Sequence, residues 1–455
     1  MPQLLLELFS EEIPARMQAR AEADLLKALT GKLSDAGLSV GEAKAWSGPR
    51  RLGVCIEDVA AHSGDVREER KGPKVGAPEK AVEGFMRGAG LASIDEAEVR
   101  SDPKKGDFYV AVIETPGRSA KDIIAEAVPD IIRSFHWPKS MRTGPNAKSH
   151  GDMRWVRPLQ RILCVLGGKT VAFDVDGLKS SNQTEGHRVH GRGPHKVADF
   201  ADYSAQLEGE GHVFLTRAAR RALIEAQAEK LCEDNCLKLR ADPGLLEEVV
   251  GLAEYPVTLL GDMDPAFLEL PPEVIQLSMR THQKYFAVED AKTGALAPHF
   301  IVVANLDPAD GGAAIKAGNA RVLSARLDDA RFFWDNDQKV GLEAMAPKLD
   351  KIAFKEELGS IGDKVERVAA LARELAPKVG ADADLAETAA RLAKADLVSE
   401  MVYEFPELQG VMGRYYALEA GEDAAVANAI SDHYKPQGPS DAVPTAPVSI
   451  AVALA

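Results

Sequence analysis

The sequence predicts an α+β protein of several domains, in which N-terminal mixed α/β domains precede an all-helical domain. Three observations support this prediction. The 455 residues suffice for about three domains at roughly 150 residues each. Strand-like patterns are concentrated before about residue 310, whereas helical spacing dominates from about Ile315 onward. With 45% apolar and 27% charged residues, the composition is typical of folded globular proteins.

Local patterns predict the elements of the N-terminal half. Apolar residues at helical spacing predict a helix over 16–33. Runs rich in β-branched residues predict strands over 51–59 and 108–114, with a polar loop over 68–76 between them. Two further runs around adjacent glycines predict a hairpin over 162–176.

The patterns that follow become progressively helical. A long helix is predicted over 217–239, and the pair Pro271-Pro272 suits the first turn of another. Two strands joined through Gly294 are predicted over 285–288 and 299–304. In the helix after residue 315, one apolar side is predicted to be buried; it contains Leu323, Leu327, Ala330 and Trp334.

These patterns predict three internal boundaries. The predicted parts are an N-terminal α+β region (1–180), a second α+β region (181–310), a helical connector (311–345) and a helical domain (346–455). The final residues, 448–455, begin an apolar helix that has no polar end or cap. We therefore expect that the helical domain is incomplete at the C-terminus.

Charge and cysteine content exclude several classes of protein. The chain has 55 Lys and Arg against 70 Asp and Glu, a net charge of −15, which argues against a surface that coats nucleic acid throughout. No apolar run approaches the roughly 18 residues of a membrane span, and the N-terminus lacks a basic signal-peptide region. The four scattered cysteines do not form a disulfide framework. We expect a cytoplasmic protein.

Positive charge is nevertheless concentrated in one segment, residues 133–161. Its seven cations and one carboxylate give a net charge of +6; they are Arg133, Lys139, Arg142, Lys148, Arg154, Arg157, Arg161 and, as the acid, Asp152. Phe135, Trp137 and Trp155 lie among them and would offer flat faces for stacking. Two interpretations stay open: contact with RNA or phosphate, and an ordinary solvated surface.

The remaining motifs do not assemble an active site. His187, His190 and His195 have no Cys or carboxylate at zinc-like spacing, which favours a solvated basic loop. Arg280 and Lys284 are spaced one helical turn apart, a spacing that suits either a shared phosphate or a solvated surface. Asp396 falls on an apolar helical face, where either a buried ion pair or cap, or a metal or catalytic carboxylate, would explain it.

Several longer strings, taken in order, resemble the beta subunits of bacterial heterotetrameric glycyl-tRNA synthetase. They are Glu7–Pro14, Gly48–Leu52, His136–Arg142, Arg154–Pro158, Gly186–Arg188, Ser278–Phe286, Arg321–Leu327, Asp329–Trp334, Lys394–Val398 and Phe405–Gly413. Each string alone is weakly specific, but their order along the whole chain makes the resemblance specific.

The resemblance implies one subunit of an enzyme that joins glycine to its tRNA with ATP. In that family two alpha and two beta chains assemble, the alpha subunit holds the glycine and ATP site, and the beta subunit grips the tRNA. ATP and Mg are thus used by the complex, and no cofactor or metal is expected on this chain. The resemblance also implies that the helical domain is HD-like, although the His-Asp dipeptide that names such domains is absent.

The leading hypothesis is therefore a subunit that binds tRNA(Gly) and the alpha subunit, without contact to membranes or DNA. Its predicted RNA-binding residues are Lys139, Arg142, Arg154, Arg157, His187, Arg188, Arg280 and Lys284; no catalytic or metal residue is assigned. Two alternatives stay open. The helical domain would be a metal-dependent phosphohydrolase that uses Asp396 and His433, or the chain would be a scaffold that does not touch RNA.

Overall fold

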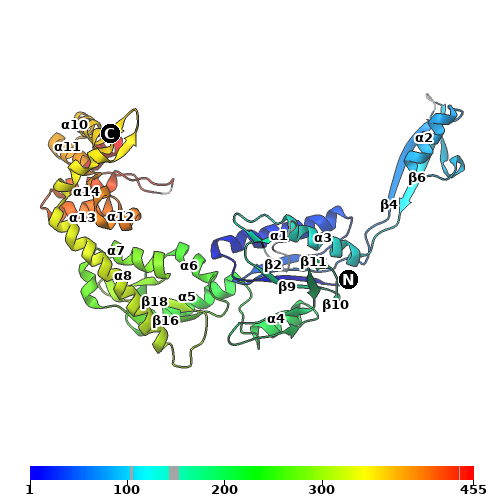
Figure 1. Ribbon diagram of the computed structural model, residues 1–455, viewed down its shortest axis with the longest axis horizontal. Helices are drawn as coiled ribbons and strands as arrows, with labels where there is room; N and C mark the ends of the chain where they lie inside the picture. The colour runs from blue at the N-terminus through cyan, green and yellow to red at the C-terminus, as the bar shows by residue number, and fades with distance from the viewer. Residues whose placement is uncertain (103–105, 143–152, 440) are drawn as a thin grey trace. The chain divides into compact units, whose positions relative to one another are not determined.

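The computed structural model describes residues 1–102, 106–142, 153–439 and 441–455, and divides into two compact units (Figure 1). The first unit contains residues 1–225, 246–257 and 304–307, and the second contains residues 226–245, 258–303 and 308–455. The chain therefore passes between the units several times, and the four contiguous parts expected from the sequence stay a prediction.

The first unit is built on a seven-stranded sheet. Six strands follow the order β11-β12-β9-β1-β3-β2, and the seventh, β10, also pairs with β9. The strands are β1 (Leu4–Ser10), β2 (Ala43–Ser47), β3 (Arg51–Ile56), β9 (Leu159–Leu166), β10 (Lys169–Thr170), β11 (Asp174–Val175) and β12 (Leu178–Ser181). β9 and β10 form the predicted hairpin. Gly167 and Gly168 have φ values of +55° and +77°, which a two-residue turn between antiparallel strands requires.

β1 lies inside this sheet, and all seven of its residues are buried. Side chains alternate between the two faces of a strand, and Leu4, Leu6 and Leu8 belong to a core cluster with α1 (Ala15–Asp35) and α3 (Ala120–Ser134). Leu5 belongs to a second cluster with α4 (Phe200–Glu208), on the opposite side of the sheet (Figure 1). α1 confirms the helix predicted over 16–33. The same alternation places Glu7 on the α4 face, inside the protein.

A smaller sheet with the strand order β4-β6-β5 packs against α2. Its elements are β4 (Val66–Lys74), β5 (Glu98–Asp102), β6 (Gly106–Thr115) and α2 (Glu79–Ala89). The predicted loop over 68–76 is wrong, because β4 pairs with β6 over most of this segment. β4 is an edge strand with exposed polar side chains, so backbone pairing holds it without the apolar alternation by which strands are recognised in a sequence.

The second unit begins with a four-stranded sheet in the order β15-β17-β18-β16. The strands are β15 (Leu237–Leu239), β16 (Val257–Asp262), β17 (Phe286–Asp290) and β18 (Leu296–Ala304), and the nearby helices are α5 (Arg217–Asp234) and α6 (Pro243–Val250). β17 and β18 confirm the strands predicted around Gly294. The helix predicted over 217–239 is too long: Cys236 has a φ of +58°, a left-handed conformation that no α-helix continues.

After this sheet the chain is mostly helical, as predicted, and α7 precedes β17. The elements are α7 (Pro272–Ser278), α8 (Ala313–Val340), α9 (Leu342–Met345), α10 (Ile361–Leu375), α11 (Ala383–Leu392), α12 (Glu400–Glu404), α13 (Val411–Glu419), α14 (Ala424–Asp432), α15 (Pro447–Leu454) and a short hairpin, β19 (Ala353–Lys355) with β20 (Gly359–Ser360). α8 buries Leu323, Leu327 and Ala330, and the half-buried Trp334 packs against the same core, which confirms its predicted inner side. Within the described residues, no helix combines the length and apolar character needed to cross a lipid bilayer.

Two buried carboxylates organise the helical part. Asp337 of α8 accepts the backbone N–H groups of Glu400 (2.9 Å) and Met401 (3.0 Å), at the start of α12, and the Tyr416 hydroxyl (2.8 Å) from α13. A carboxylate at a helix N-terminus satisfies backbone donors that have no partner inside the helix. Asp337 therefore ties three helices together, a role that its place in the sequence did not reveal.

Asp396 is the second of these carboxylates and is fully buried. Its Oδ2 accepts the N–H groups of Gly410 (2.6 Å) and Gly413 (3.0 Å) around the start of α13, while Oδ1 has no partner among the described residues. Of the interpretations left open for Asp396, the structure shows the capping contact. Burial raises the pKa of Asp396 to about 6, whereas burial and the charge of Lys394 lower the pKa of His433 to about 4.

The pKa of Asp396 predicts a pH-dependent stability. Because this pKa is raised in the folded state, the associated stability is present below about pH 4 and is lost as the pH rises through about 6. Asp396→Asn removes this loss and places an amide donor near the site of Oδ1. The free energy of unfolding of the variant minus that of the wild type, measured by urea denaturation, should increase by up to about 3 kcal/mol between pH 4 and pH 7.

Because the pKa of His433 is lowered in the folded state, its contribution to stability increases with pH, opposite to that of Asp396. The difference between variant and wild type therefore isolates Asp396 better than either pH profile alone. A difference that stays constant over this pH range would contradict the assignment of a buried, capping carboxylate to Asp396.

Candidate nucleic-acid interface

The basic segment is anchored by an aromatic cluster. The ring centroids of Phe135, Trp137 and Trp155 lie 5.0–5.1 Å from one another. Trp155 is fully buried and Trp137 is 7% exposed, so the prediction that these tryptophans offer stacking faces to bases is wrong. They instead pack in the core beside α1 and α3 and hold the short hairpin of β7 (Met141–Arg142) and β8 (Arg154–Trp155).

This hairpin places two arginines side by side. Arg142 is the cross-strand partner of Arg154, and both side chains are exposed. Like charges directly opposite one another in a sheet are destabilising, and a bound anion would relieve the repulsion. The nearby Lys139 is exposed and Arg157 is half-buried. Lys148 and Asp152, which the sequence also places in this segment, lie outside the described residues.

Ion pairing divides the cations of this segment into two groups. Arg133 pairs with Asp176 (3.4 Å) and Arg161 pairs with Glu185 (2.6 Å). In the described part of the chain, no carboxylate forms an ion pair with the second group, Lys139, Arg142, Arg154 and Arg157. This second group, which we call the hairpin cations, carries four positive charges; Arg157 also donates from Nη1 to the backbone oxygen of Val156 (2.9 Å).

A buried charge network lies on the α4 face of the same sheet. The fully buried Arg51 of β3 donates from Nη1 to Glu7 Oε2 (3.0 Å) and from Nη2 to Glu254 Oε1 (3.0 Å). Arg50 donates to the other oxygen of Glu254 (2.6 Å). Glu7 also accepts the hydroxyls of Thr184 and Tyr203. Paired in this way, charges can be buried without the full cost of desolvation.

Electrostatics keep Glu254 ionised. Burial alone would raise the pKa of Glu254, but the Arg51 and Arg50 guanidiniums hold it below its ordinary value. Sequence reasoning missed these residues, although one signal was present: Glu7 interrupts the apolar run of β1. A charged residue in the middle of a buried strand predicts a buried partner of opposite sign.

The network positions the loop over 185–192. Arg51 Nη2 donates to the backbone oxygen of Glu185 (3.0 Å), and Arg50 Nη2 donates to that of Gly186 (2.7 Å). His187 is 1% exposed, and its Nδ1 accepts two backbone N–H groups of its own loop. Because burial lowers the pKa of His187, its ring is neutral near pH 7. His187, a predicted RNA-binding residue, is therefore buried, with its ring turned toward the backbone of its own loop.

Arg188 lies on the outer side of this loop, with its side chain half exposed. It pairs with Glu12 Oε1 (3.1 Å) and Glu11 Oε2 (3.5 Å). Exposed pairs of this kind contribute about 0–1 kcal/mol, so phosphate can compete for Arg188. The structure therefore brings Arg188 to the surface but leaves it partly neutralised.

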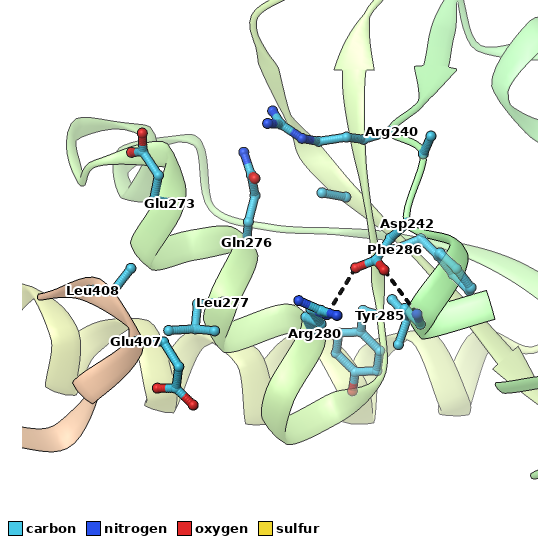
Figure 2. A pocket seen from close by; sticks show the side chains of 13 residues that line it. Arg240, Asp242, Glu273, Gln276, Leu277, Arg280, Tyr285, Phe286, Glu407 and Leu408 are labelled. Carbon is cyan, nitrogen blue, oxygen red and sulfur yellow. Dashed lines mark hydrogen bonds and ion pairs between the residues drawn. The ribbon is translucent and has the colours of Figure 1, made fainter. Parts of the chain in front are cut away.

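The other two predicted residues, Arg280 and Lys284, lie in the second unit, where Arg280 lines a pocket of about 230 Å³ (Figure 2). Its lining residues come from the segment between β15 and the start of α6, from α7 and the residues that follow it, from β17, and from Glu407 and Leu408. Figure 2 shows Arg240, Asp242, Glu273, Gln276 and Arg280 around the same space. Two strings of the resemblance, more than a hundred residues apart in the sequence, thus meet at one pocket. Its mixed charges suit a polar ligand with both donors and acceptors better than a bare phosphate.

Arg280 does not extend freely into this pocket. Its Nε donates to Asp242 Oδ2 (3.0 Å), and the Asp242 Oδ1 accepts the N–H of Leu245 (2.9 Å) (Figure 2). α7 ends at Ser278 and continues as a π-helix over Met279–Gln283, after which Lys284 has a φ of +59°. The prediction that Arg280 and Lys284 lie one turn apart on a single α-helix is therefore wrong, because Arg280 lies in the π-helical turn and Lys284 follows its end.

In the described residues, no group of three or more His, Cys, Asp and Glu side chains is arranged to hold a metal ion. Asp396 is engaged by backbone donors, and His433 Nδ1 is 2.7 Å from the backbone oxygen of Ile430. This arrangement gives the phosphohydrolase alternative no described metal-ligand set.

Comparison with known proteins places these features in a family. A family model described as glycyl-tRNA synthetase beta subunit matches residues 4–455. The glycine–tRNA ligase beta subunit of Ruegeria sp. (strain TM1040) is 55% identical over 464 aligned residues, which cover 100% of this chain and 66% of the relative. That of Dinoroseobacter shibae is 52% identical over 462 residues, with 100% and 63% covered. The chain thus spans about two thirds of the length of these curated relatives.

The buried network predicts a large effect of a conservative change. Glu254→Gln removes the charge that Arg50 and Arg51 share, so we expect the free energy of unfolding to fall by about 3 kcal/mol. The measurement is urea denaturation at pH 7. The matched control is Glu247→Gln, which removes an exposed partner of Arg217 and should cost under about 1 kcal/mol. Equal effects of the two changes would contradict the special role of the buried network.

Proposed function

Because the chain belongs to the family of glycyl-tRNA synthetase beta subunits, we propose that it binds tRNA(Gly) and the alpha subunit of glycine–tRNA ligase. In this proposal the alpha subunit carries the ATP-dependent attachment of glycine to the tRNA, and the chain presents the tRNA to it. The proposed assembly contains two alpha and two beta chains and acts in the cytoplasm. ATP and Mg are used by the complex and are not assigned to residues of this chain.

The observation that supports tRNA binding most directly is the group of hairpin cations. Arg142 and Arg154 face each other on neighbouring strands without a described carboxylate partner, in a protein whose net charge is −15. Nucleic-acid affinity depends mainly on cations that replace the counterions of phosphates. A surface that keeps positive charges together and unpaired, while its neighbours Arg133 and Arg161 are paired, is suited to this exchange.

The scaffold alternative makes the opposite prediction for these cations. A scaffold that holds alpha subunits without touching RNA needs no unpaired arginines on adjacent strands, and its tRNA affinity would be negligible. The metal-dependent phosphohydrolase alternative has less support, because the capping contacts of Asp396 explain its burial.

Replacing Lys139, Arg142, Arg154 and Arg157 together with Ala tests the hairpin cations. We expect weaker binding of tRNA(Gly) and, because up to four phosphate contacts are lost, a log–log salt dependence that is shallower by about 3. The measurement is fluorescence anisotropy of labelled tRNA between about 50 and 200 mM salt, the range over which such contacts change affinity most visibly.

The control replaces four exposed arginines that the structure shows in ion pairs, Arg100, Arg118, Arg373 and Arg391. It changes the net charge of the protein by the same amount but removes none of the hairpin cations. Equal losses of affinity and slope in the two variants would mean that overall charge, rather than this surface, governs binding.

Partnership with the alpha subunit is tested by reconstitution. When the chain is mixed with purified alpha subunit, glycine, ATP and tRNA(Gly), we expect charged tRNA to form well above the level of alpha alone, because the chain supplies the tRNA grip. Size-exclusion chromatography of the same mixture should show a complex. Absence of both the complex and the gain in charging would overturn the proposed function.

A further inference from the structure

Five aromatic rings of the first unit form a cluster of contacts, which we call the aromatic stack. His187 and His190 are stacked at 5.1 Å with an interplanar angle of 16°, and Tyr255 and Phe214 are stacked at 5.6 Å. His212 joins the two pairs, 5.7 Å from His190 and 5.4 Å from Tyr255. His187 is buried, whereas the other four rings are half-buried and belong to none of the hydrophobic cores among the described residues.

Close backbone packing builds this stack. A side chain at Gly186 would overlap the carbonyl oxygens of Gly191 and Gly211. Because Gly186 has none, the loop over 185–192 can contact the loop over 209–214. His212 has a φ of +52°, a strained conformation for a non-glycine residue that the surrounding structure must maintain. Its ring is thereby held beside Tyr255.

Tyr255 and His190 are fixed from further sides. The Asn305 side-chain oxygen accepts the N–H groups of Glu254 (2.8 Å) and Tyr255 (3.0 Å), which fixes the backbone at Tyr255. Tyr255 also follows Glu254, a member of the buried charge network, in the sequence. The N–H of Asp307 donates to His190 Nε2 (3.0 Å). The stack is therefore preorganised by hydrogen bonds to the backbone on both sides.

One ring nitrogen of each of the three histidines is engaged by the backbone. His187 Nδ1 and His190 Nε2 both accept backbone N–H groups, and His212 Nδ1 is 3.0 Å from the backbone oxygen of Glu210. Among the described residues, these histidines are also not part of any group of three or more side chains that could hold a metal ion. What the cluster leaves for a ligand is a set of π-faces, which bind other flat rings by stacking.

Cations flank these rings. Arg188 and Arg192 belong to the same loop as His187 and His190, and both side chains are exposed. Half-buried aromatic rings beside exposed arginines are the combination by which proteins hold unpaired nucleotides, with the base stacked and its phosphate neutralised. We propose that His190, His212 and Tyr255 form a stacking site for an unpaired base of the bound tRNA, a proposal that rests on the proposed function.

The site differs physically from the hairpin cations. Stacking is insensitive to salt, whereas phosphate contacts set the salt dependence of binding. Loss of a stacking ring should therefore lower the affinity at every salt concentration by the same factor and leave the slope of log affinity against log salt unchanged.

The test replaces Tyr255 with Leu, which keeps an apolar side chain but removes the ring. We expect tRNA(Gly) to bind about tenfold more weakly with an unchanged salt slope, and Tyr255→Phe, which retains the ring, to restore most of the affinity. A short single-stranded RNA that contains 2-aminopurine reports stacking directly: its fluorescence should be quenched by the wild type and by Tyr255→Phe, but not by Tyr255→Leu.

His212→Asn provides a second variant, because Asn tolerates a positive φ while the ring is removed; it decides the matter if Tyr255→Leu does not fold. Wild-type affinity and quenching in a folded variant would overturn the stacking site while leaving the proposed function intact. If the wild-type chain itself does not bind tRNA(Gly), the proposed function fails first, and the stacking site fails with it.

Discussion

The guanidinium of Arg51 lies between the carboxylates of Glu7 and Glu254 with no exposure to solvent, and the architecture of the first unit depends on this contact. Glu7 belongs to an inner strand of the sheet, Arg51 to its neighbour, and Glu254 to a segment about two hundred residues later. Burying these charges is tolerable only while each keeps its partner. The network therefore fixes the positions of the 185–192 loop and of the segment around Tyr255 relative to the sheet.

Positive charge is therefore used in two ways in this acidic protein. Arg50, Arg51 and the buried Arg220 have all their partners inside the fold; Arg220 donates only to backbone oxygens, and burial lowers its pKa to about 10. Among the described residues, the hairpin cations form no ion pair with a carboxylate, and three of them, Lys139, Arg142 and Arg154, are exposed. Interior charges fix the shape of the surface on which the exterior charges are displayed, and only the exterior ones can exchange counterions for phosphates.

Much of the fold could be predicted from periodicity, because α1, α8 and the hairpin around Gly167 have regular apolar spacing or a specific turn. β4 and the end of α5 could not, since an exposed edge strand and a single left-handed residue leave no periodic signal. In the candidate site, the local excess of charge identified the hairpin cations. The burial of Trp155 and His187 and the pairing of Arg280 with Asp242 depend on residues distant in the sequence, so spacing alone could not reveal them.

In the proposed complex, tRNA lies against the hairpin cations and the aromatic stack of the first unit. Photochemical cross-linking of the chain, in complex with the alpha subunit, to tRNA(Gly) that carries 4-thiouridine tests it most directly, with the cross-linked peptides identified by mass spectrometry. We expect cross-links within residues 139–157 and within the 185–192 and 209–214 loops. Cross-links confined to the sheet of β4, β5 and β6 or to the helices after residue 342 would contradict it.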